Sequence, residues 1–143
     1  MLVNDDEGLK RILSAARRIA VLGMKPESRS DRPAYFVPRY LAKAGYEVIP
    51  VPVYYPEVTR ILDGPVYRTL AAVPGPIDIV QVFRRPEDIP PHVPDIIASR
   101  PRTVWFQSGI RHSEAERQLS EAGIEVVADR CMMVEHERLI VGD

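Results

Sequence analysis

Basic side chains gather at two points of the sequence where they could bind an anionic ligand. The first is a polar loop, residues 24–32, that leads into a helix pattern and contains three cations and two hydroxyl groups: Lys25, Arg29, Arg32, Ser28 and Ser30. The free N–H groups and the macrodipole of a helix N-terminus favour a phosphate group nearby. The loop therefore predicts a phosphate site, although its composition alone is equally typical of a solvated polar loop without a ligand.

A second basic pair, Arg84–Arg85, directly follows the clearest strand pattern of the sequence, Ile77–Phe83. We expect both clusters at one crevice, because the carboxyl ends of parallel strands lie along one edge of a sheet. Two clusters from separate strand ends favour an anionic ligand over a solvated surface. Apolar residues near the same ends would form a wall suited to a flat base: Pro50, Val51, Pro52 and Phe83.

The fingerprint of a dinucleotide site is largely missing. Such a site needs Gly-x-Gly-x-x-Gly after the first strand and an acidic residue about 20 positions further on. Here Gly23 is followed by Met-Lys-Pro-Glu, and the second strand pattern ends in Pro50-Val51-Pro52, without Asp or Glu. Both differences disfavour NAD as the ligand.

Residues for acid–base or nucleophilic catalysis are few. The only histidines are His92, which we expect at the surface, His112, which we expect at a helix entry, and His136. The single cysteine, Cys131, lies about 140° from His136 on a helix of 3.6 residues per turn, which is not the spacing of a helical metal site. We interpret Cys131 as a buried structural residue, since the sequence shows neither a base for it nor a nucleophile-elbow motif.

The elements that must position these residues follow from alternating β-branched runs and helical patterns. Strands are predicted at 19–22, 47–51, 77–83, 103–106 and 124–128, with a short edge strand within 57–62. Helices are predicted at 7–18, from Pro33 to Gly45 with Asp31 as the candidate cap, at 86–97, at 113–122 with the capping box Ser113–Glu116, and at 131–139. Pro38 is an awkward residue inside the second helix, because proline has no N–H group to donate.

This alternation predicts an α/β fold: a Rossmann-like, doubly wound parallel sheet of about five core strands in three α/β/α layers, with right-handed crossovers. With the first strand in the centre, the predicted order is 3-2-1-4-5, and the ligand crevice opens where that order reverses. The strand ends facing it would be Gly23, 50–52, 83–85 and 107–109. We expect residues 1–143 to form one domain.

Composition limits the class of protein. The chain has 143 residues and a formal net charge of -1, so bulk charge does not indicate a nucleic-acid partner. The sequence contains no apolar run near the roughly 20 residues of a membrane helix, no apolar signal core, and one cysteine that cannot form an internal disulfide. We therefore expect a cytoplasmic protein without a membrane partner. The 14 prolines are equally consistent with heat stability and with a GC-rich genome.

Five short motifs resemble, in this order, those of the small, stand-alone CoA-binding protein family. They are IAVLGM with DRPAY, GYEVIPV, IDIVQVFRR, VWFQSGI and ADRCMMVEH, and they extend over nearly the whole chain. The family is similar in fold to the nucleotide-binding domain of the succinyl-CoA synthetase α chain. Two features depart from the family pattern, namely a longer phosphate loop at residues 26–31 and Ala34, where serine is common.

The resemblance implies that coenzyme A lies across the crevice, with its phosphates paired by basic groups. Contacts with the phosphates are implied for Gly23, Met24, Lys25 and Arg32, with the hydroxyl of Ser28 in the same loop. The adenine and ribose would be bordered by Pro50, Val51 and Pro52. The pyrophosphate or the pantetheine arm would lie beside Phe83 and Arg84, and the further reach would be lined by Gln107, Gly109 and Ile110.

We therefore predict a protein that binds CoA or an acyl-CoA without enzymatic activity of its own, such as a sensor, a carrier or a partner subunit. In the similar synthetases, catalysis requires a further domain with a phosphorylated histidine and a partner subunit. Two alternatives stay open. One is an enzyme that uses NADP or an acyl-CoA substrate. The other is an interaction module with a vestigial crevice, in which residues 132–134 could form the surface of a homodimer or contact an unknown protein partner.

Overall fold

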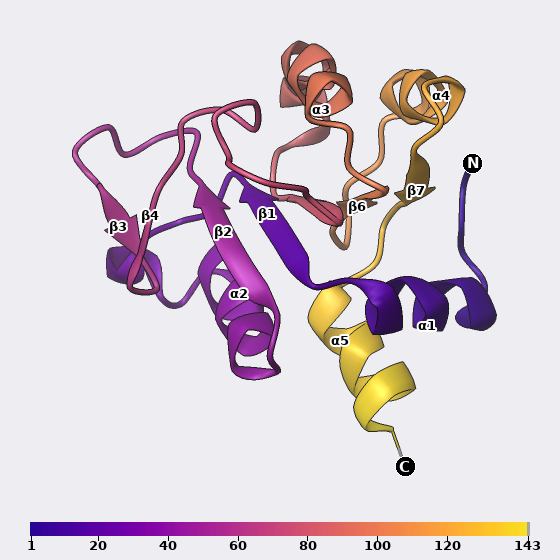
Figure 1. The fold of residues 1–143 in the computed structure, drawn as a ribbon, viewed down its shortest axis with the longest axis horizontal. Helices are drawn as coiled ribbons and strands as arrows, with labels where there is room; N and C mark the ends of the chain where they lie inside the picture. Colours follow the sequence, from indigo (N-terminus) through magenta and orange to yellow (C-terminus); the bar gives the residue numbers. More distant parts are fainter. Residues whose placement is uncertain (143) are drawn as a thin grey trace.

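Five parallel strands form the central sheet of the computed structural model, in which residues 1–142 are described (Figure 1). They are β1 (Arg18–Leu22), β2 (Glu47–Val51), β5 (Ile79–Val82), β6 (Thr103–Phe106) and β7 (Glu125–Val127). Each neighbouring pair is parallel, and the spatial order is β2-β1-β5-β6-β7. The predicted Rossmann-like α/β fold is confirmed.

The predicted strand order is wrong. Counted along the chain, the five core strands have the order 2-1-3-4-5 instead of 3-2-1-4-5, because β5 pairs with β1 on the side away from β2. The expected edge strand within residues 57–62 is the two-residue strand β3 (Arg60–Ile61), which pairs antiparallel with β4 (Gly64–Pro65) outside the main sheet. The order reverses between β1 and β5, so a ligand crevice is expected at their carboxyl ends.

Helices cover both faces of the sheet and complete the three predicted layers. One face is covered by α1 (Asp6–Ala15), α2 (Pro33–Lys43) and α5 (Met132–His136), which continues as a π-helical turn, Glu137–Val141. The other face is covered by α3 (Val93–Ser99) and α4 (Ser113–Glu121), seen at the top of Figure 1. Short 3₁₀ turns lie at Glu27–Arg29, Pro86–Asp88 and Pro90–His92. None of the helices within residues 1–142 has the length and apolarity to span a bilayer.

The central strands are buried on both faces, which explains their nearly continuous apolar sequences. All residues of β5 and β6 are buried, and successive side chains alternate between the two helical layers. Gln81 in the middle of β5 is fully buried although it is polar. Its side chain donates a hydrogen bond to Gln107, which follows β6 at the carboxyl edge of the sheet.

The starts of two helices differ from the predicted caps. The N-cap of α2 is Arg32, which makes no side-chain cap, so Asp31 lies one residue too early to cap this helix. The N-cap of α4 is His112, whose Nδ1 accepts a hydrogen bond from Ala115 N at 3.1 Å. The Glu116 carboxylate accepts from His112 N at 2.8 Å. His112 and Glu116 therefore form a reciprocal cap. It begins one residue earlier than the predicted capping box, and the imidazole of His112 takes the place of the Ser113 hydroxyl group.

Both outer strands of the sheet are partly covered. Beside β7, a parallel bridge joins Leu2 to Val126, and Val3 N donates to the Val126 carbonyl at 2.8 Å. Beside β2, the Pro50 carbonyl accepts from Tyr67 N at 3.0 Å. Proline has no N–H group, so Pro50 leaves no free donor on this edge.

Candidate functional site

A cleft of about 610 Å³ opens at the carboxyl ends of the strands, where the order of the sheet reverses. Its walls come from the loop after β1, the first turns of α2, the segments after β5 and β6, and the start of α5. The structure brings the following predicted residues together in this lining: Lys25, Arg32, Phe83, Arg84, Gln107, Gly109 and Ile110. Sequence reasoning did not assign to the site the lining residues at the starts of α2 and α5, which are Pro33, Ala34, Phe36, Val37, Cys131 and Met133.

The other predicted residues do not line the cleft. Pro50, Val51 and Pro52 are buried at the end of β2, and Met24 is buried in the core. Ser28 is exposed on the 3₁₀ turn that precedes α2. Gly23 is also outside the lining, and contacts of all the predicted residues with CoA stay predictions.

Gly23 brings the ends of β1 and β5 into close contact. Its φ is +89°, and a Cβ at this position would lie 2.3 Å from the carbonyl oxygen of Phe83. Only glycine combines this backbone conformation with so close an approach. The Gly23 N–H donates to the Val51 carbonyl at 2.9 Å, so the glycine also links β1 to β2. Gly23 thus holds the ends of β1, β2 and β5 together next to Phe83, which lines the cleft.

Pro38 helps to position Lys25 at the cleft. A proline inside a helix cannot donate to the carbonyl four residues earlier. That carbonyl, of Ala34, instead accepts the N–H of Lys25 at 3.1 Å. The helix continues through Pro38 while its first turn holds the loop after β1. A residue that is unfavourable for the helix thus supplies the acceptor that fixes this loop.

Glu27 holds the rest of the loop against the β3–β4 hairpin. Its Oε2 accepts from Leu62 N at 2.8 Å and from the Tyr35 hydroxyl at 3.5 Å. Burial raises the pKa of Tyr35, and the Glu27 carboxylate raises it further. Arg29 follows on the exposed turn and is not among the lining residues, in contrast to Lys25 and Arg32.

The charged part of the cleft is cationic. Within residues 1–142 its lining contains Lys25, Arg32, Arg84 and Arg85 and no carboxylate. Asp88 lies behind the second pair, with its Oδ2 3.1 Å from Arg85 Nε and 3.8 Å from Arg84 Nη2. Neither Lys25 nor Arg32 forms an ion pair in the described chain. The cleft therefore attracts anions, and the cations near α2 are free to pair with them.

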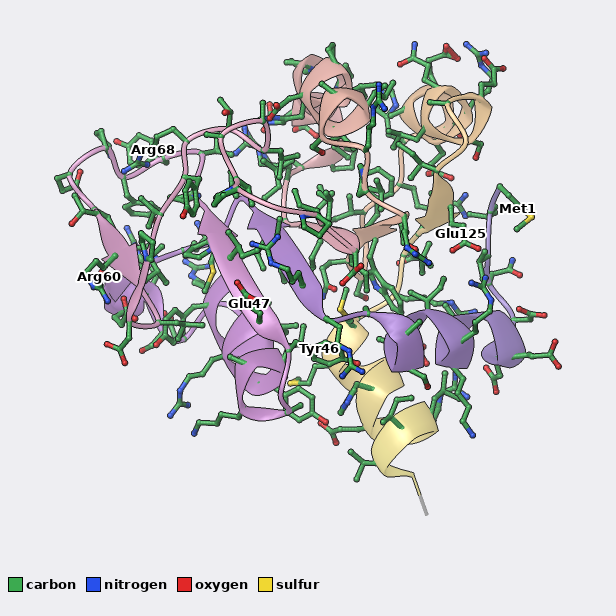
Figure 2. All side chains as sticks on the ribbon, viewed as in Figure 1. Met1, Tyr46, Glu47, Arg60, Arg68 and Glu125 are labelled. Carbon is green, nitrogen blue, oxygen red and sulfur yellow. The ribbon has the colours of Figure 1, made fainter. Side chains whose placement is uncertain are left out.

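The loop after β2 lies next to this cationic part. Lys25 Nζ lies 5.8 Å from the centroid of the Tyr55 ring. Arg68 supports the loop from outside by donating to the carbonyls of Tyr54 at 3.2 Å, Tyr55 at 3.0 Å and Val58 at 2.5 Å (Figure 2). Guanidinium has five donors in a fixed plane, which suits several carbonyls at once. No sequence motif indicated this support.

Most of the other side chains in the lining are apolar, and we call them the apolar part. They include Phe36 and Val37 of α2, together with Met133 of α5 and the half-buried thiol of Cys131. Cys131 is the N-cap residue of α5 and belongs to the cleft wall, which corrects our interpretation of it as a buried structural residue. The predicted helix begins at residue 131, whereas α5 begins at Met132, and this difference places Cys131 just before the helix.

A pair of buried amides lies beneath this apolar part. Gln107 follows β6, and its Oε1 accepts from Gln81 Nε2 at 3.0 Å and from Met132 N at 3.1 Å. Gln81 Oε1 is buried without a partner within residues 1–142. The amide pair thus connects the centre of β5 to the start of α5.

The lining offers binding groups and few groups for proton transfer. Among the described residues it includes no His, Asp or Glu, and no group of three such ligands suits a metal ion anywhere in residues 1–142. The histidines lie elsewhere: His112 caps α4, and His136 Nδ1 is 2.9 Å from the Tyr40 hydroxyl. His92 lies behind Arg84, and burial, followed by that positive charge, lowers its pKa. The arrangement suits an anionic ligand with a long uncharged portion.

Comparison with known proteins agrees with this geometry. The family model of the CoA binding domain matches residues 17–137. The chain is 37% identical over 128 residues to the uncharacterized protein YneT of Bacillus subtilis, covering 90% of this chain and 91% of that protein. A solved structure from Thermus thermophilus, ID.343, is 46% identical with a TM-score of 0.88, covering 96% of this chain and all (100%) of that one.

A more distant similarity concerns the fold alone. The dinucleotide-forming acetyl-coenzyme A synthetase 1 of Ca. Korarchaeum cryptofilum is 15% identical, with a TM-score of 0.66. The match covers 82% of this chain and 26% of the synthetase chain. The same arrangement of strands and helices therefore occurs as one part of a much longer protein.

Proposed function

The chain belongs to the CoA binding domain family, and on this premise we propose that its cleft binds coenzyme A or an acyl-CoA. The observation that supports the proposal most is that one cleft combines several cations, without carboxylates, with many apolar side chains. CoA has the matching combination, since it has phosphates at the nucleotide end and an uncharged pantetheine arm. The ligand would lie across the carboxyl edge of the sheet.

The phosphates would be held by Lys25, Arg32 and the start of α2. Neither cation would have to leave a carboxylate, so pairing with phosphate would break no existing ion pair. The N-terminus of α2 has no side-chain cap, and its macrodipole adds positive potential at the same place. Arg84, whose Nε is buried without a partner in the described chain, would add a donor from the β5 side.

The pantetheine arm would extend over the apolar part of the cleft, between α2 and α5. We propose binding without catalysis, because a general acid or base is most often His, Asp or Glu, and the lining within residues 1–142 has none. A carrier, sensor or partner-subunit role fits such a site.

Isothermal titration calorimetry with CoA tests the proposal. Absence of both heat and a thermal shift at millimolar CoA would refute it. Arg32→Ala should weaken CoA at least about tenfold, as expected for a charged hydrogen bond. The matched control is Arg29→Ala, because Arg29 is a cation of the same loop outside the cleft lining, and it should change the affinity less than about twofold. A larger loss with CoA than with dephospho-CoA would assign Arg32 to the 3′-phosphate, and equal losses would assign it to the pyrophosphate.

A further inference from the structure

Gln107 exposes one half of its side-chain amide to the cleft. The residue lines the cleft although it is only 4% exposed. Its Oε1 already accepts two hydrogen bonds, from Gln81 Nε2 and from Met132 N. Its Nε2 has no hydrogen-bond partner within residues 1–142 and is not sealed off from solvent as Gln81 Oε1 is. A side chain that is more than nine-tenths buried thus presents unpaired N–H donors to the cleft.

The direction of this amide is set by the backbone. The oxygen and nitrogen of a side-chain amide are assigned from their hydrogen-bond partners. Met132 N is a main-chain donor and cannot accept, so the Gln107 atom that faces it must be the oxygen. Gln81 can then only donate to the same oxygen. The atom of Gln107 that faces the cleft is therefore a donor, and a bound ligand must present an acceptor to it.

The position of Gln107 selects an uncharged acceptor. The bond to Met132 N holds its side chain beside Cys131 and Met133, which line the apolar part of the cleft. The cations without an ion pair, Lys25 and Arg32, lie on other segments, after β1 and at the start of α2, whereas Arg84 follows β5, the strand next to β6. In the proposed complex Lys25 and Arg32 hold the phosphates, so the acceptor opposite Gln107 belongs to the uncharged portion of the ligand. In CoA and its thioesters, that portion presents carbonyl oxygens.

We propose that Gln107 donates a hydrogen bond to a carbonyl oxygen of the bound ligand. The carbonyl belongs either to an amide of the pantetheine arm or to the thioester of an acyl-CoA. This inference rests on the proposed function, because it concerns the same cleft and the same ligand. A ligand that covers this donor must present an acceptor to it, since an N–H group that loses its contact with solvent and gains no partner is costly.

The substitution Gln107→Glu tests the proposal with little change in shape. One carboxylate oxygen can still accept from Met132 N and Gln81 Nε2, while the other replaces the donor that faces the cleft by an acceptor. Ser108→Glu is the matched control, because Ser108 is an exposed neighbour in the same lining and receives the same charge. Calorimetry would compare CoA, acetyl-CoA and 3′,5′-ADP, which has the 3′-phosphate and one of the two 5′-phosphates of CoA and no pantetheine arm.

We expect Gln107→Glu to weaken CoA, acetyl-CoA or both about tenfold more than it weakens 3′,5′-ADP. A selective loss for both thiol and thioester assigns the carbonyl to the pantetheine arm, and a selective loss for acetyl-CoA alone assigns it to the thioester. Equal losses for all three ligands, as expected for Ser108→Glu, would overturn the proposal.

A second measurement covers the case in which the variant does not fold. In ¹⁵N-labelled wild-type protein, the side-chain NH₂ resonances of Gln107 should shift on addition of CoA or acetyl-CoA, and much less with 3′,5′-ADP. Unshifted resonances in the presence of bound CoA would refute the assignment of Gln107 alone. A wild-type protein that binds none of the three ligands would instead refute the proposed function.

Discussion

The contact between Gly23 and the end of β5 leads to a quantitative prediction for Gly23→Ala. The new Cβ would lie 2.3 Å from the Phe83 carbonyl oxygen and 3.2 Å from Arg84 Cδ. A backbone oxygen at the end of a buried strand cannot move alone, so β1 and β5 must separate or their ends must distort. The cleft residues Phe83 and Arg84 would be displaced with them.

Two costs add in this variant. A non-glycine residue at φ +89° costs about 1–2 kcal/mol, as in other left-handed conformations. Overpacking of a filled interior costs about 1–3 kcal/mol more. The control is Gly123→Ala, where φ is +86° and no heavy atom lies within 4 Å of the new Cβ. It should lose only the conformational part, about 1–2 kcal/mol.

Urea denaturation, followed by the fluorescence of the buried Trp105, measures both losses. We expect Gly23→Ala to lose about 1–3 kcal/mol more than Gly123→Ala. We also expect it to weaken CoA binding, which Gly123→Ala should leave unchanged. Equal losses of stability in the two variants would refute the argument that close approach, rather than conformation alone, requires glycine at position 23.

Three further predictions concern other parts of the chain. Pro38→Ala restores an N–H that competes for the acceptor of Lys25 N, so CoA affinity should fall roughly two- to tenfold in calorimetry without a loss of thermal stability. Burial lowers the pKa of His136 below its usual 6.5, so the unfolded chain binds more protons and the free energy of unfolding falls as the pH drops below 6.5. In urea titrations from pH 8 to 5, His136→Gln should flatten this dependence by up to about 1.4 kcal/mol per pH unit. His112→Ala should cost about 1 kcal/mol in the same assay, because Ala115 N loses its cap.

Each of these expectations has a contrary outcome. Unchanged CoA affinity in Pro38→Ala would show that the loop after β1 keeps its position without the Ala34 carbonyl. Parallel pH profiles for the wild type and His136→Gln would show that His136 does not contribute to the acid sensitivity of the fold. Unchanged stability of His112→Ala, with His112→Asn as the variant that retains a cap, would refute the capping role.

Local patterns predicted most elements because the strands of this sheet are buried on both faces. The run Thr103–Phe106 is entirely buried and was predicted at its observed bounds. The strand order was predicted wrongly, because pairing of β5 with β1 depends on contacts between segments that are distant along the chain. The β3–β4 hairpin is too short for any periodicity, with two residues in each strand.

The candidate site was predictable to the extent that it lies at strand ends. Lys25, Arg84 and Gln107 lie shortly after the ends of β1, β5 and β6, so the topology brings them to one edge of the sheet. Cys131 was misassigned because its orientation depends on the first residue of α5. The direction of the Gln107 amide requires its contact with Met132 N, which no pattern in the sequence reveals.

The covered edges of the sheet should reduce aggregation. Strands at the rim of a sheet can add a strand from another chain, which is a common first step of aggregation. Here Pro50 has no N–H group to donate at the outer edge of β2. The segment that includes Leu2 and Val3 pairs with part of the outer edge of β7. At high concentration or temperature, strand pairing between molecules should therefore be rarer than for a sheet with exposed edge strands. Detachment of residues 1–3 from β7 would be the first step that exposes an edge strand for such pairing.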